Sequence, residues 1–478
     1  MPQKQKFYHI LTFGCQMNKN DSERIAGLLS SLSFRATTKP EKAEVLIINT
    51  CSVRQHAEDR VYGLIREWQK FRKDKSNLFI GVTGCLPGRD QDGKLLKKIK
   101  GVDWFFPIKD LPMLPAKLAG RDALTSRRGV STSCDNYFQF SPKRKENFRI
   151  FVAIQTGCNN FCSYCVVPYA RGQEKNRPVK DILAEIKQAV AKGAKEVTLL
   201  GQVVNNYQAL DPENFSKNNP FVSLSSRAKS RDPLDRLQGI PPCVRSVHLV
   251  GMTVLDHFAA LLWEINNIKG LERINWTAAD PQYFSEELIQ ALTLPKQVNY
   301  LHLPAQSGDN EILKKMNRKY SGEAYLKLIK KIRKTKPDIA IGTDIIVGFC
   351  GETKKQFQNT VALYKKCAFD LAYLAQYSER SGTLAAKMFK DDVVKAEKKR
   401  RWQILQNLME KIVWQKNQTY LGRTVSVLVD KYKNGQCLGN SSEMKLVSFL
   451  GNKKLIGKII KVKITEAKKW VLYGKQIT

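Results

Sequence analysis

Blocks of apolar residues alternate with amphipathic segments from residue 7 to residue 84. The apolar runs 7–13, 43–50 and 78–84 have the length and composition of β-strands. The segments 20–32 and 52–71 between them have helical periodicity, and we expect Asp21 or Ser22 to cap the first helix. Strands that alternate with helices at this spacing predict a parallel sheet with helices on its faces.

A second run of alternating strands and helices begins at residue 148. We expect its strands at 148–157, 196–200, 272–276, 298–303, 339–347 and 370–375. Repeated β–α units over this length predict a full or partial parallel barrel with its active residues at the carboxyl ends of the strands. The stretch 208–256, rich in Ser, Arg and Pro, breaks the rhythm and is interpreted as a surface insertion that could be disordered.

The chain changes character twice after residue 390. A basic helix from Asp391 carries Trp402, Leu405, Leu408 and Ile412 at spacings of three and four, which is typical of an amphipathic linker helix. Short alternating runs after it predict a small antiparallel β-barrel. The fold class is therefore α/β, and the expected division of the chain is an N-terminal domain at 1–120, a polar linker at 121–147, a central domain at 148–390, the linker helix at 391–418 and the small barrel at 419–478.

The charge of the chain is strongly positive. Its 478 residues carry a formal net charge of +36, which favours a polyanionic partner, most often nucleic acid, over a basic proteome or a solubility bias. Residues 420–478 hold twelve Lys or Arg and three Asp or Glu, so we favour RNA contact by the small barrel over a merely solvated barrel. The chain has no apolar run that could span a bilayer and no signal-peptide core, which predicts a cytoplasmic protein without membrane contact.

Three cysteines follow the first three predicted strands. Cys15, Cys51 and Cys85 stand in "FGC", "NTC" and "TGC". In a parallel sheet the ligand site lies beyond the carboxyl ends of the strands, so the three thiols are expected at one edge. Because all three stand where a strand leads into a helix, metal or cluster ligation is favoured over three unrelated buried cysteines.

Three more cysteines, Cys158, Cys162 and Cys165, lie in a single loop with the spacing CxxxCxxC. Structural zinc sites prefer four ligands, and three thiolates would leave one position open. A 4Fe-4S cluster held by three thiolates has one open iron, which can chelate the amine and carboxylate of a substrate or cofactor.

This loop resembles that of the radical S-adenosylmethionine superfamily, because it follows the first strand of a predicted barrel and has an aromatic residue, Tyr164, before its third cysteine. The stretches "FGCQMNKNDSERI", "NTCSVRQHAEDRVYG", "GCNNFCSYCVVPYARGQEKNRP", "LLGQVVNNY", "LHLPAQSGDNEILKKMNRKY" and "TDIIVGFCGET" together resemble the MiaB-type tRNA methylthiotransferases. The small barrel resembles their TRAM domain. The likeness covers the chain except the insertion. Departures are Leu-Pro-Gly-Arg after Cys85, Val203 in place of Asn, Cys350 in place of Pro, and missing prolines at 377–386.

The resemblance implies two 4Fe-4S clusters with different roles. The cluster on Cys158, Cys162 and Cys165 would generate a radical from S-adenosylmethionine, and the cluster on Cys15, Cys51 and Cys85 would carry or donate sulfur. The implied reaction uses two S-adenosylmethionines and adds a methylthio group to C2 of N-isopentenyl-adenosine at position 37, in the anticodon stem-loop of tRNA. A flavodoxin- or ferredoxin-like protein would supply electrons, and the enzyme is expected to be a monomer.

Further residues have candidate roles. Tyr164, Gly201, Gln202, Gln306 and Asp344 are the candidates for the S-adenosylmethionine pocket, with loop structure or capping as the alternative for the last four. Arg171 and Arg177 could face phosphate or be simple surface charges, and His302 is expected to be a packed or hydrogen-bonded histidine.

Two other functions stay open on the sequence. A sister enzyme would act on threonylcarbamoyl-adenosine in tRNA, although "GCQMN" and "NTCSVR" resemble the isopentenyl-adenosine branch. Alternatively, a non-catalytic RNA-binding protein would use its iron-sulfur clusters for structure or redox sensing.

Overall fold

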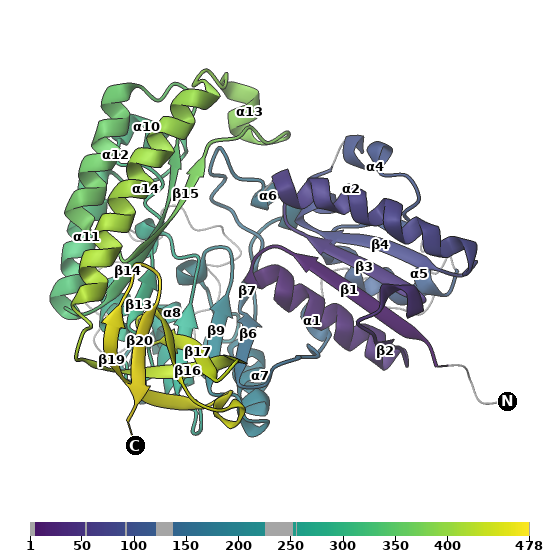
Figure 1. Cartoon of the computed structure of the whole chain (residues 1–478), viewed down its shortest axis with the longest axis horizontal. Helices are drawn as coiled ribbons and strands as arrows, with labels where there is room; N and C mark the ends of the chain where they lie inside the picture. The colour runs from purple at the N-terminus through teal and green to yellow at the C-terminus, as the bar shows by residue number, and fades with distance from the viewer. Residues whose placement is uncertain are drawn as a thin grey trace.

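The computed structural model describes residues 5–52, 55–90, 93–120, 137–224, 252–254 and 256–477. The described chain forms an N-terminal α/β domain, a central domain with parallel strands and a small C-terminal barrel (Figure 1). This confirms the predicted α/β fold class and its three structural parts. No helix in these ranges combines the length and the apolar character needed to cross a membrane.

The N-terminal domain is built on a five-stranded parallel sheet in the order β2-β1-β3-β4-β5. Its central strand is buried along its length, with Leu46 and Ile48 in one apolar core and Val45 and Ile47 in the other. Helices therefore cover both faces, as the alternation of strands and helices predicts. The elements are β1 (Phe7–Phe13), α1 (Gln16–Ser31), β2 (Arg35–Ala36), β3 (Val45–Thr50), α2 (Gln55–Gln69), β4 (Phe79–Gly84), α3 (Cys85–Arg89), α4 (Lys94–Lys98), β5 (Trp104–Phe105) and α5 (Leu114–Leu118).

Helix α1 begins earlier than the sequence suggested. Its N-cap residue is Cys15, and the cap predicted at Asp21 or Ser22 is wrong. The side chain of Asn18 accepts a hydrogen bond from the backbone N–H of Cys15 at 3.3 Å, so the first turn is fixed by a residue inside the helix. Asp21 and Ser22 instead make tertiary contacts, Asp21 with the hydroxyl of Tyr137 and Ser22 with the amide of Asn49.

The central domain is an open parallel barrel made of two three-stranded sheets, β12-β9-β6 and β13-β14-β15. An isolated bridge between Ile274 and Gln297 joins them. All six predicted strands are confirmed, and helices pack around them into one large apolar core. The elements are β6 (Arg149–Ala153), β7 (Gln155–Thr156), α6 (Val167–Arg171), β8 (Lys175–Asn176), α7 (Val179–Ala191), β9 (Glu196–Leu200), α8 (His257–Asn266), β12 (Arg273–Trp276), α9 (Glu286–Ala291), β13 (Tyr300–His302), α10 (Asn310–Lys315), α11 (Gly322–Thr335), β14 (Ala340–Val347), α12 (Lys354–Cys367), β15 (Leu371–Gln376) and α13 (Leu384–Met388).

The edges of the expected insertion at 208–256 belong to the folded domain. Asp211 accepts hydrogen bonds from the backbone N–H groups of Val179 and Lys180, at 2.5 and 3.1 Å, and so caps α7. Phe215 and Phe221 are buried in the main core, and β10 (Val222–Leu224) pairs with β11 (Met252–Val254). The interpretation as a surface insertion is therefore wrong for residues 208–222, and residues 225–251 lie outside the described ranges.

The predicted amphipathic helix is α14 (Lys395–Gln418), which lies beside β15 in Figure 1. Leu405 is fully buried in the central core, and Trp402, Leu408 and Ile412 pack against the same core. The helix is thus a structural element of the central domain as well as its connection to the C-terminal barrel.

The C-terminal barrel closes in the order β16-β17-β18-β20-β19. Its pairs are antiparallel except for β18 with β20, which is parallel. The strands are β16 (Thr424–Lys433), β17 (Gln436–Ser441), β18 (Leu446–Leu450), β19 (Ile459–Ala467) and β20 (Leu472–Gln476).

The barrel packs against the amino ends of the central strands. Arg273, the first residue of β12, donates hydrogen bonds to the carbonyl oxygens of Ser426 and Asn440, at 2.6 and 3.0 Å. Arg149, the first residue of β6, forms an ion pair with Asp430 at 3.1 Å. The C-terminal barrel therefore lies at the opposite end of the central strands from their carboxyl ends, as Figure 1 also shows.

Buried ion pairs connect the N-terminal and central domains. Glu185 on α7 lies 3.3 Å from Arg24 of α1 and 2.5 Å from Arg177, and it also pairs with Arg144. Burial alone would raise the pKa of Glu185, but the three guanidinium groups outweigh it and hold the pKa below its usual value. Arg177 is therefore a buried residue held by an ion pair within the central domain, and the suggestion that it faces phosphate or is a surface charge is wrong.

Glu23 of α1 lies at the same interface, but nearby cations offset the burial of its carboxylate less well than they do for Glu185. Its Oε2 has no hydrogen-bond partner, and the closest guanidinium nitrogen, Nε of Arg144, is 3.9 Å away. Burial raises the pKa of Glu23 to about 7. The folded protein then binds more protons than the unfolded chain between the ordinary carboxyl pKa and pH 7, so stability falls as pH rises through this window.

Replacing Glu23 with Gln should remove this pH dependence, because Gln mimics the protonated carboxyl. At pH 5 the variant and the parent should melt at similar temperatures. At pH 8 the variant should be more stable by about 2 kcal/mol and melt several degrees higher. Thermal unfolding at the two pH values measures this. The control is Glu213→Gln, which changes an exposed carboxylate. An equal effect of Glu23→Gln at both pH values would contradict the prediction.

Candidate functional site

The three N-terminal cysteines follow three adjacent strands at one edge of the sheet. Phe13 of β1 is paired with Thr50 of β3, and Thr50 is paired with Gly84 of β4. Cys15 comes two residues after Phe13, and Cys51 and Cys85 come directly after Thr50 and Gly84. Cys51 and Cys85 are buried and Cys15 is exposed. The register thus brings the triplet together where the sequence predicted it.

Glycines before two of these cysteines allow the loops to approach each other closely. Gly14 has φ of 147°, and a Cβ there would lie 2.3 Å from Oδ1 of Asn18 and 3.0 Å from Cβ of Cys51. Gly84 has φ of 102°, and a Cβ there would lie 2.4 Å from the carbonyl oxygen of Thr50. Both positions therefore require glycine for conformation and for space.

A pair of buried asparagines holds the first two cysteine loops together. The amide of Asn18 donates to Oδ1 of Asn49 at 3.0 Å, and the amide of Asn49 donates back to the carbonyl oxygen of Asn18 at 2.8 Å. The thiol of Cys15 donates to Oδ1 of Asn18 at 3.4 Å. The asparagines of "CQMN" and "NTC" therefore position the cysteines.

The second triplet lies in the loop after β6, and each of its sulfur atoms accepts an N–H hydrogen bond. The donors are the backbone of Asn160 to Cys158 at 3.5 Å, the backbone of Val167 to Cys165 at 3.4 Å, and Nη1 of Arg318 to Cys162 at 3.2 Å. Thiolates and cluster sulfurs attract such donors, so an all-cysteine site with N–H groups directed at its sulfurs fits an iron-sulfur cluster.

Two later loops hold this cysteine loop in position. Ser163 donates through its backbone to Met316 at 3.0 Å and through its hydroxyl to Lys315 at 2.7 Å. The amide of Asn317 donates to the carbonyl oxygen of Phe161 at 3.0 Å. The amide of Asn160 donates to Asp280 at 2.9 Å. The sequence analysis did not predict roles for Asn317, Arg318 or Asp280. Asn317 and Arg318 lie in the family-like stretch that ends in "KKMNRKY", which could have drawn attention to them. Nothing in the sequence pointed to Asp280.

Burial affects the protonation of the thiols. It raises the pKa of Cys158 to about 11 and that of Cys165 to about 12. It also raises the pKa of Cys85, opposed by the nearby guanidinium of Arg171. Binding of a cluster would therefore release protons. In the described ranges no group of three or more His, Cys, Asp or Glu side chains is arranged to hold a metal ion. The thiolates of a cluster bind different irons and need not converge on one ion.

A helix–helix contact joins the two cysteine sites. Helix α3 begins at Cys85, and α6 begins two residues after Cys165. A Cβ on Gly88 of α3 would lie 2.0 Å from the carbonyl oxygen of Ala170 in α6, so the two backbones touch. The last residue of α6, Arg171, is buried and forms an ion pair of 2.6 Å with Asp21. The suggestion that Arg171 faces phosphate or is a surface charge is therefore wrong.

The candidates for the S-adenosylmethionine pocket follow the carboxyl ends of central strands or lie along them. Gly201 and Gln202 come directly after β9, and Oε1 of Gln202 is buried without a hydrogen-bond partner. Gln306 has φ of 63° and donates its backbone N–H to Asp344 of β14 at 2.8 Å. Tyr164 packs against the small core around Phe349. The unpaired oxygen of Gln202 fits a donor group on a bound ligand.

His302 faces Asp344 across the two adjacent strands. Its Nε2 lies 3.1 Å from Oδ2 of Asp344, and its Nδ1 lies 3.1 Å from the hydroxyl of Tyr300. The expectation of a hydrogen-bonded histidine is confirmed. The side chain of Asp344 is 38% exposed, so it keeps an accessible face besides this contact.

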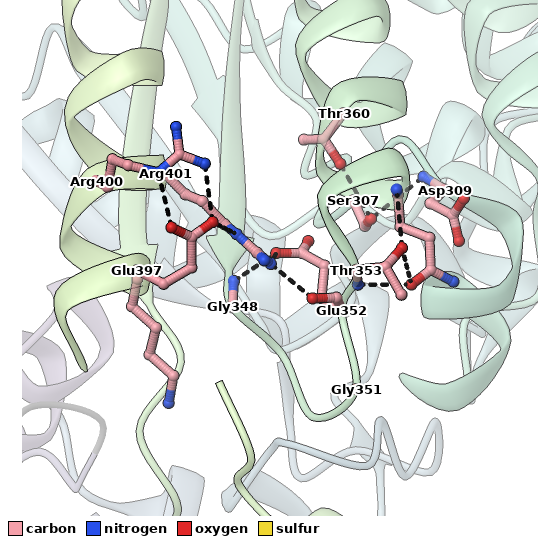
Figure 2. A network of polar contacts seen from close by, with 12 residues as sticks. Ser307, Asp309, Gly348, Gly351, Glu352, Thr353, Thr360, Glu397, Arg400 and Arg401 are labelled. Carbon is pink, nitrogen blue, oxygen red and sulfur yellow. Dashed lines mark hydrogen bonds and ion pairs between the residues drawn. The ribbon is translucent and has the colours of Figure 1, made fainter. Parts of the chain in front are cut away.

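The motif "GFCGET" after β14 is stabilised by α14 (Figure 2). The carboxylate of Glu352 accepts hydrogen bonds from the backbone N–H of Gly348 at 2.7 Å and from Arg401 at 2.6 Å. Arg401 also contacts Glu397, which pairs with Arg400 as well. Glu352 is therefore a structural residue that fixes the loop following Asp344.

Comparisons with known proteins assign this architecture to a class. Residues 152–364 match the model of the "Radical SAM superfamily", residues 7–107 match "Uncharacterized protein family UPF0004", and residues 418–477 match the "TRAM domain". The fold and the CxxxCxxC loop thus define a radical S-adenosylmethionine enzyme with an additional domain on each side. This class implies a 4Fe-4S cluster and S-adenosylmethionine as cofactors.

Relatives with nearly the same length identify the family. The tRNA-2-methylthio-N(6)-dimethylallyladenosine synthase of Thermoanaerobacter sp. (strain X514) is 39% identical over 99% of this chain and 93% of its own. The synthases of Caldicellulosiruptor saccharolyticus and Carboxydothermus hydrogenoformans are 40% and 39% identical, over 99% and 98% of this chain and 93% and 99% of their own. The chain belongs to the family of tRNA-2-methylthio-N(6)-dimethylallyladenosine synthases, which confirms the MiaB-type resemblance.

A solved structure supports the fold independently. The radical S-adenosylmethionine methyltransferase TsrM from Kitasatospora setae, solved with cobalamin and a [4Fe-4S] cluster, superposes with a TM-score of 0.52 at 14% identity. The match covers 80% of this chain and 77% of TsrM. At this identity the likeness describes the arrangement of the elements.

Replacing Arg401 with Met should destabilise the protein, because it leaves the fully buried carboxylate of Glu352 without its cation. We expect a loss of about 3 kcal/mol or more and a melting temperature several degrees lower. The matched control is Arg400→Met on the same helix, where the side chain is 50% exposed and little change is expected. Thermal unfolding of both variants measures this, and equal effects would contradict the role assigned to Arg401.

Proposed function

We propose that this protein is a tRNA methylthiotransferase that converts N-isopentenyl-adenosine at position 37 into its 2-methylthio derivative. The observation that carries the proposal is the contact of α3 with α6, which places the two cysteine sites side by side. Radical formation at one site and sulfur supply at the other can then act on one base. The names of the relatives support the substrate.

Cys158, Cys162 and Cys165 are the proposed ligands of the radical-forming cluster. A 4Fe-4S cluster held by these thiolates would supply the electron for the reductive cleavage of S-adenosylmethionine. The supporting observation is the set of N–H donors on the three sulfurs. The loop contacts of Ser163 and Asn317 hold these ligands fixed.

Cys15, Cys51 and Cys85 are the proposed ligands of a second 4Fe-4S cluster. A cluster held by these thiolates would carry or donate the sulfur, since a soft metal site suits a sulfide. The strand register, the two glycines and the asparagine pair support the assignment because they fix three thiols at one sheet edge. The exposure of Cys15 leaves that edge accessible.

S-adenosylmethionine is proposed to bind at the carboxyl ends of the central strands. Gly201 provides backbone without a side chain, and Gln202 offers an unpaired amide oxygen to a donor on the ligand. Gln306 follows β13 and Asp344 lies in β14, and the two are linked by a backbone hydrogen bond. Tyr164 comes from the cysteine loop itself. One molecule would serve as the radical source and another as the methyl donor.

The proposed macromolecular partner is the anticodon stem-loop of tRNA, bound in the cytoplasm by a monomer. Exposed lysines of the C-terminal barrel support RNA contact; they include Lys431, Lys433, Lys453, Lys454, Lys461 and Lys463. The barrel lies at the amino ends of the central strands, so it would contact RNA away from the modified base. Lys468 and Lys469 instead pair with Glu466 and Glu410. A flavodoxin- or ferredoxin-like protein is the proposed reductant.

An activity assay with the reduced protein distinguishes the proposed function from its alternatives. Protein reconstituted with iron and sulfide is incubated with dithionite, S-adenosylmethionine and an anticodon stem-loop carrying N-isopentenyl-adenosine. Wild type should form both 5′-deoxyadenosine and 2-methylthio product. Cys165→Ala should form neither, and Cys51→Ala should form 5′-deoxyadenosine without detectable methylthio product. Chromatography with mass detection measures both compounds.

The matched controls are a stem-loop carrying threonylcarbamoyl-adenosine and the variant Cys437→Ala, which removes a buried thiol of the C-terminal barrel far from both triplets. Cys437→Ala should behave as wild type. Methylthio product on the threonylcarbamoyl substrate alone would assign the sister activity. Absence of 5′-deoxyadenosine from a cluster-loaded wild type would favour the non-catalytic RNA-binding protein. Loss of 5′-deoxyadenosine in a folded Cys51→Ala would contradict separate roles.

A further inference from the structure

Each cysteine site has one buried arginine that lies near a cysteine and is held by one buried aspartate. At the N-terminal site the pair is Arg171 with Asp21, whose side chains are 2% and 0% exposed. At the central site the pair is Arg318 with Asp280, whose side chains are 7% and 4% exposed. Neither pair was expected from the sequence.

Arg171 reaches the N-terminal site from the central domain. It is the last residue of α6, and its Nη2 lies 2.6 Å from Oδ2 of Asp21 on α1. Its neighbour Ala170 contacts Gly88, three residues after Cys85, so the guanidinium lies near that cysteine, and its positive charge opposes the rise in the pKa of the Cys85 thiol that burial causes. The hydroxyl of Tyr137 donates to the other oxygen of Asp21 at 2.6 Å, so the aspartate is held in place. A positive charge from one domain is thus fixed beside a cysteine of the other.

Arg318 has the same relation to the central site. Its Nη1 lies 3.2 Å from the sulfur of Cys162 and 3.0 Å from Oδ2 of Asp280. Its Nε donates to the hydroxyl of Tyr320 at 3.1 Å, and Asn160 donates to Asp280 at 2.9 Å. The planar guanidinium can serve sulfur, carboxylate and hydroxyl at once, which a lysine could not do.

A structural role alone accounts poorly for the two pairs. Buried ion pairs cost desolvation that their attraction only partly offsets, so they are weak contributors to stability. A hydrogen bond and a positive charge beside a cluster sulfur, in contrast, favour the reduced, more negative form of the cluster. The position of one buried guanidinium beside the cysteines of each site therefore points to electron transfer.

We propose that Arg171 and Arg318 are positioning residues that set the reduction potentials of the two clusters separately, Arg171 that of the Cys15, Cys51 and Cys85 cluster and Arg318 that of the Cys158, Cys162 and Cys165 cluster. The inference rests on the proposed function only in that both triplets hold clusters. Beyond that function, the inference assigns to each site one side chain that sets the reduction potential of its cluster. It also makes the potential of the N-terminal cluster depend on a residue of the central domain.

The test uses two single-cluster backgrounds of the full chain. Replacing Cys158, Cys162 and Cys165 with Ala leaves the N-terminal cluster, and replacing Cys15, Cys51 and Cys85 leaves the central one. Arg171→Met and Arg318→Met are introduced into each background. Midpoint potentials are measured by redox titration followed by electron paramagnetic resonance, without any turnover. Each substitution should lower the potential of its own cluster, with a fall of about tenfold in the ratio of reduced to oxidised cluster, or 59 mV for one electron.

The matched controls are Arg171→Met in the background that keeps the central cluster and Arg318→Met in the background that keeps the N-terminal cluster. In each control the midpoint potential should shift less than when the substitution lies beside the cluster that is kept. Arg→Lys at either position should recover part of the shift, because it keeps the charge. The double variants Arg171→Met with Asp21→Asn and Arg318→Met with Asp280→Asn remove both charges, so a fold disturbed by a lone buried aspartate can be recognised. Unchanged potentials in folded, iron-loaded variants, or equal shifts in both backgrounds, would overturn the inference. Failure of either background to bind iron would instead overturn the proposed function.

Discussion

The architecture depends on the close contact between α3 and α6. Helix α3 starts at Cys85 and α6 follows Cys165, so the contact of Gly88 with Ala170 determines how near the two cysteine sites lie. A side chain at position 88 would push the backbones apart, because its Cβ would fall 2.0 Å from a carbonyl oxygen. The ion pairs of Arg171 with Asp21 and of Glu185 with Arg24 cross the same interface. Chemistry that needs a radical and a sulfur donor at one base requires such proximity.

The C-terminal barrel is fixed at the other end of the central strands. Arg149 and Arg273 tie it to the first residues of β6 and β12, and the cysteine loop follows the last residue of β6. A bound RNA would therefore contact the C-terminal barrel at one end of the central domain and the cysteine sites at the other. The proposed arrangement would separate recognition of the RNA backbone, which is electrostatic and independent of sequence, from recognition of the modified base.

The sequence predicted the elements well because its local patterns are strong. The buried run of β3, the six central strands and the amphipathic α14 all follow from periodicity. The edges of the expected insertion were wrong because Asp211 and Phe215 make contacts that no local pattern reveals. Arg171 was misjudged for the same reason, since its partner Asp21 lies 150 positions away in the chain. The spacing of the cysteines was enough to predict the candidate site. The roles of Asp280 and Arg318 could be recognised only in the folded structure, because they contact the cysteine loop from distant parts of the chain.

The proposal that the two cysteine sites hold neighbouring clusters is tested most directly by the magnetic interaction between them. Electron paramagnetic resonance spectra would be recorded for fully reduced wild type and for the two triple cysteine variants that each keep one site. Paramagnetic clusters held side by side broaden and split each other's signals. The account predicts a wild-type spectrum that differs from the sum of the two single-site spectra. A wild-type spectrum equal to that sum, in protein shown to hold both clusters, would contradict it.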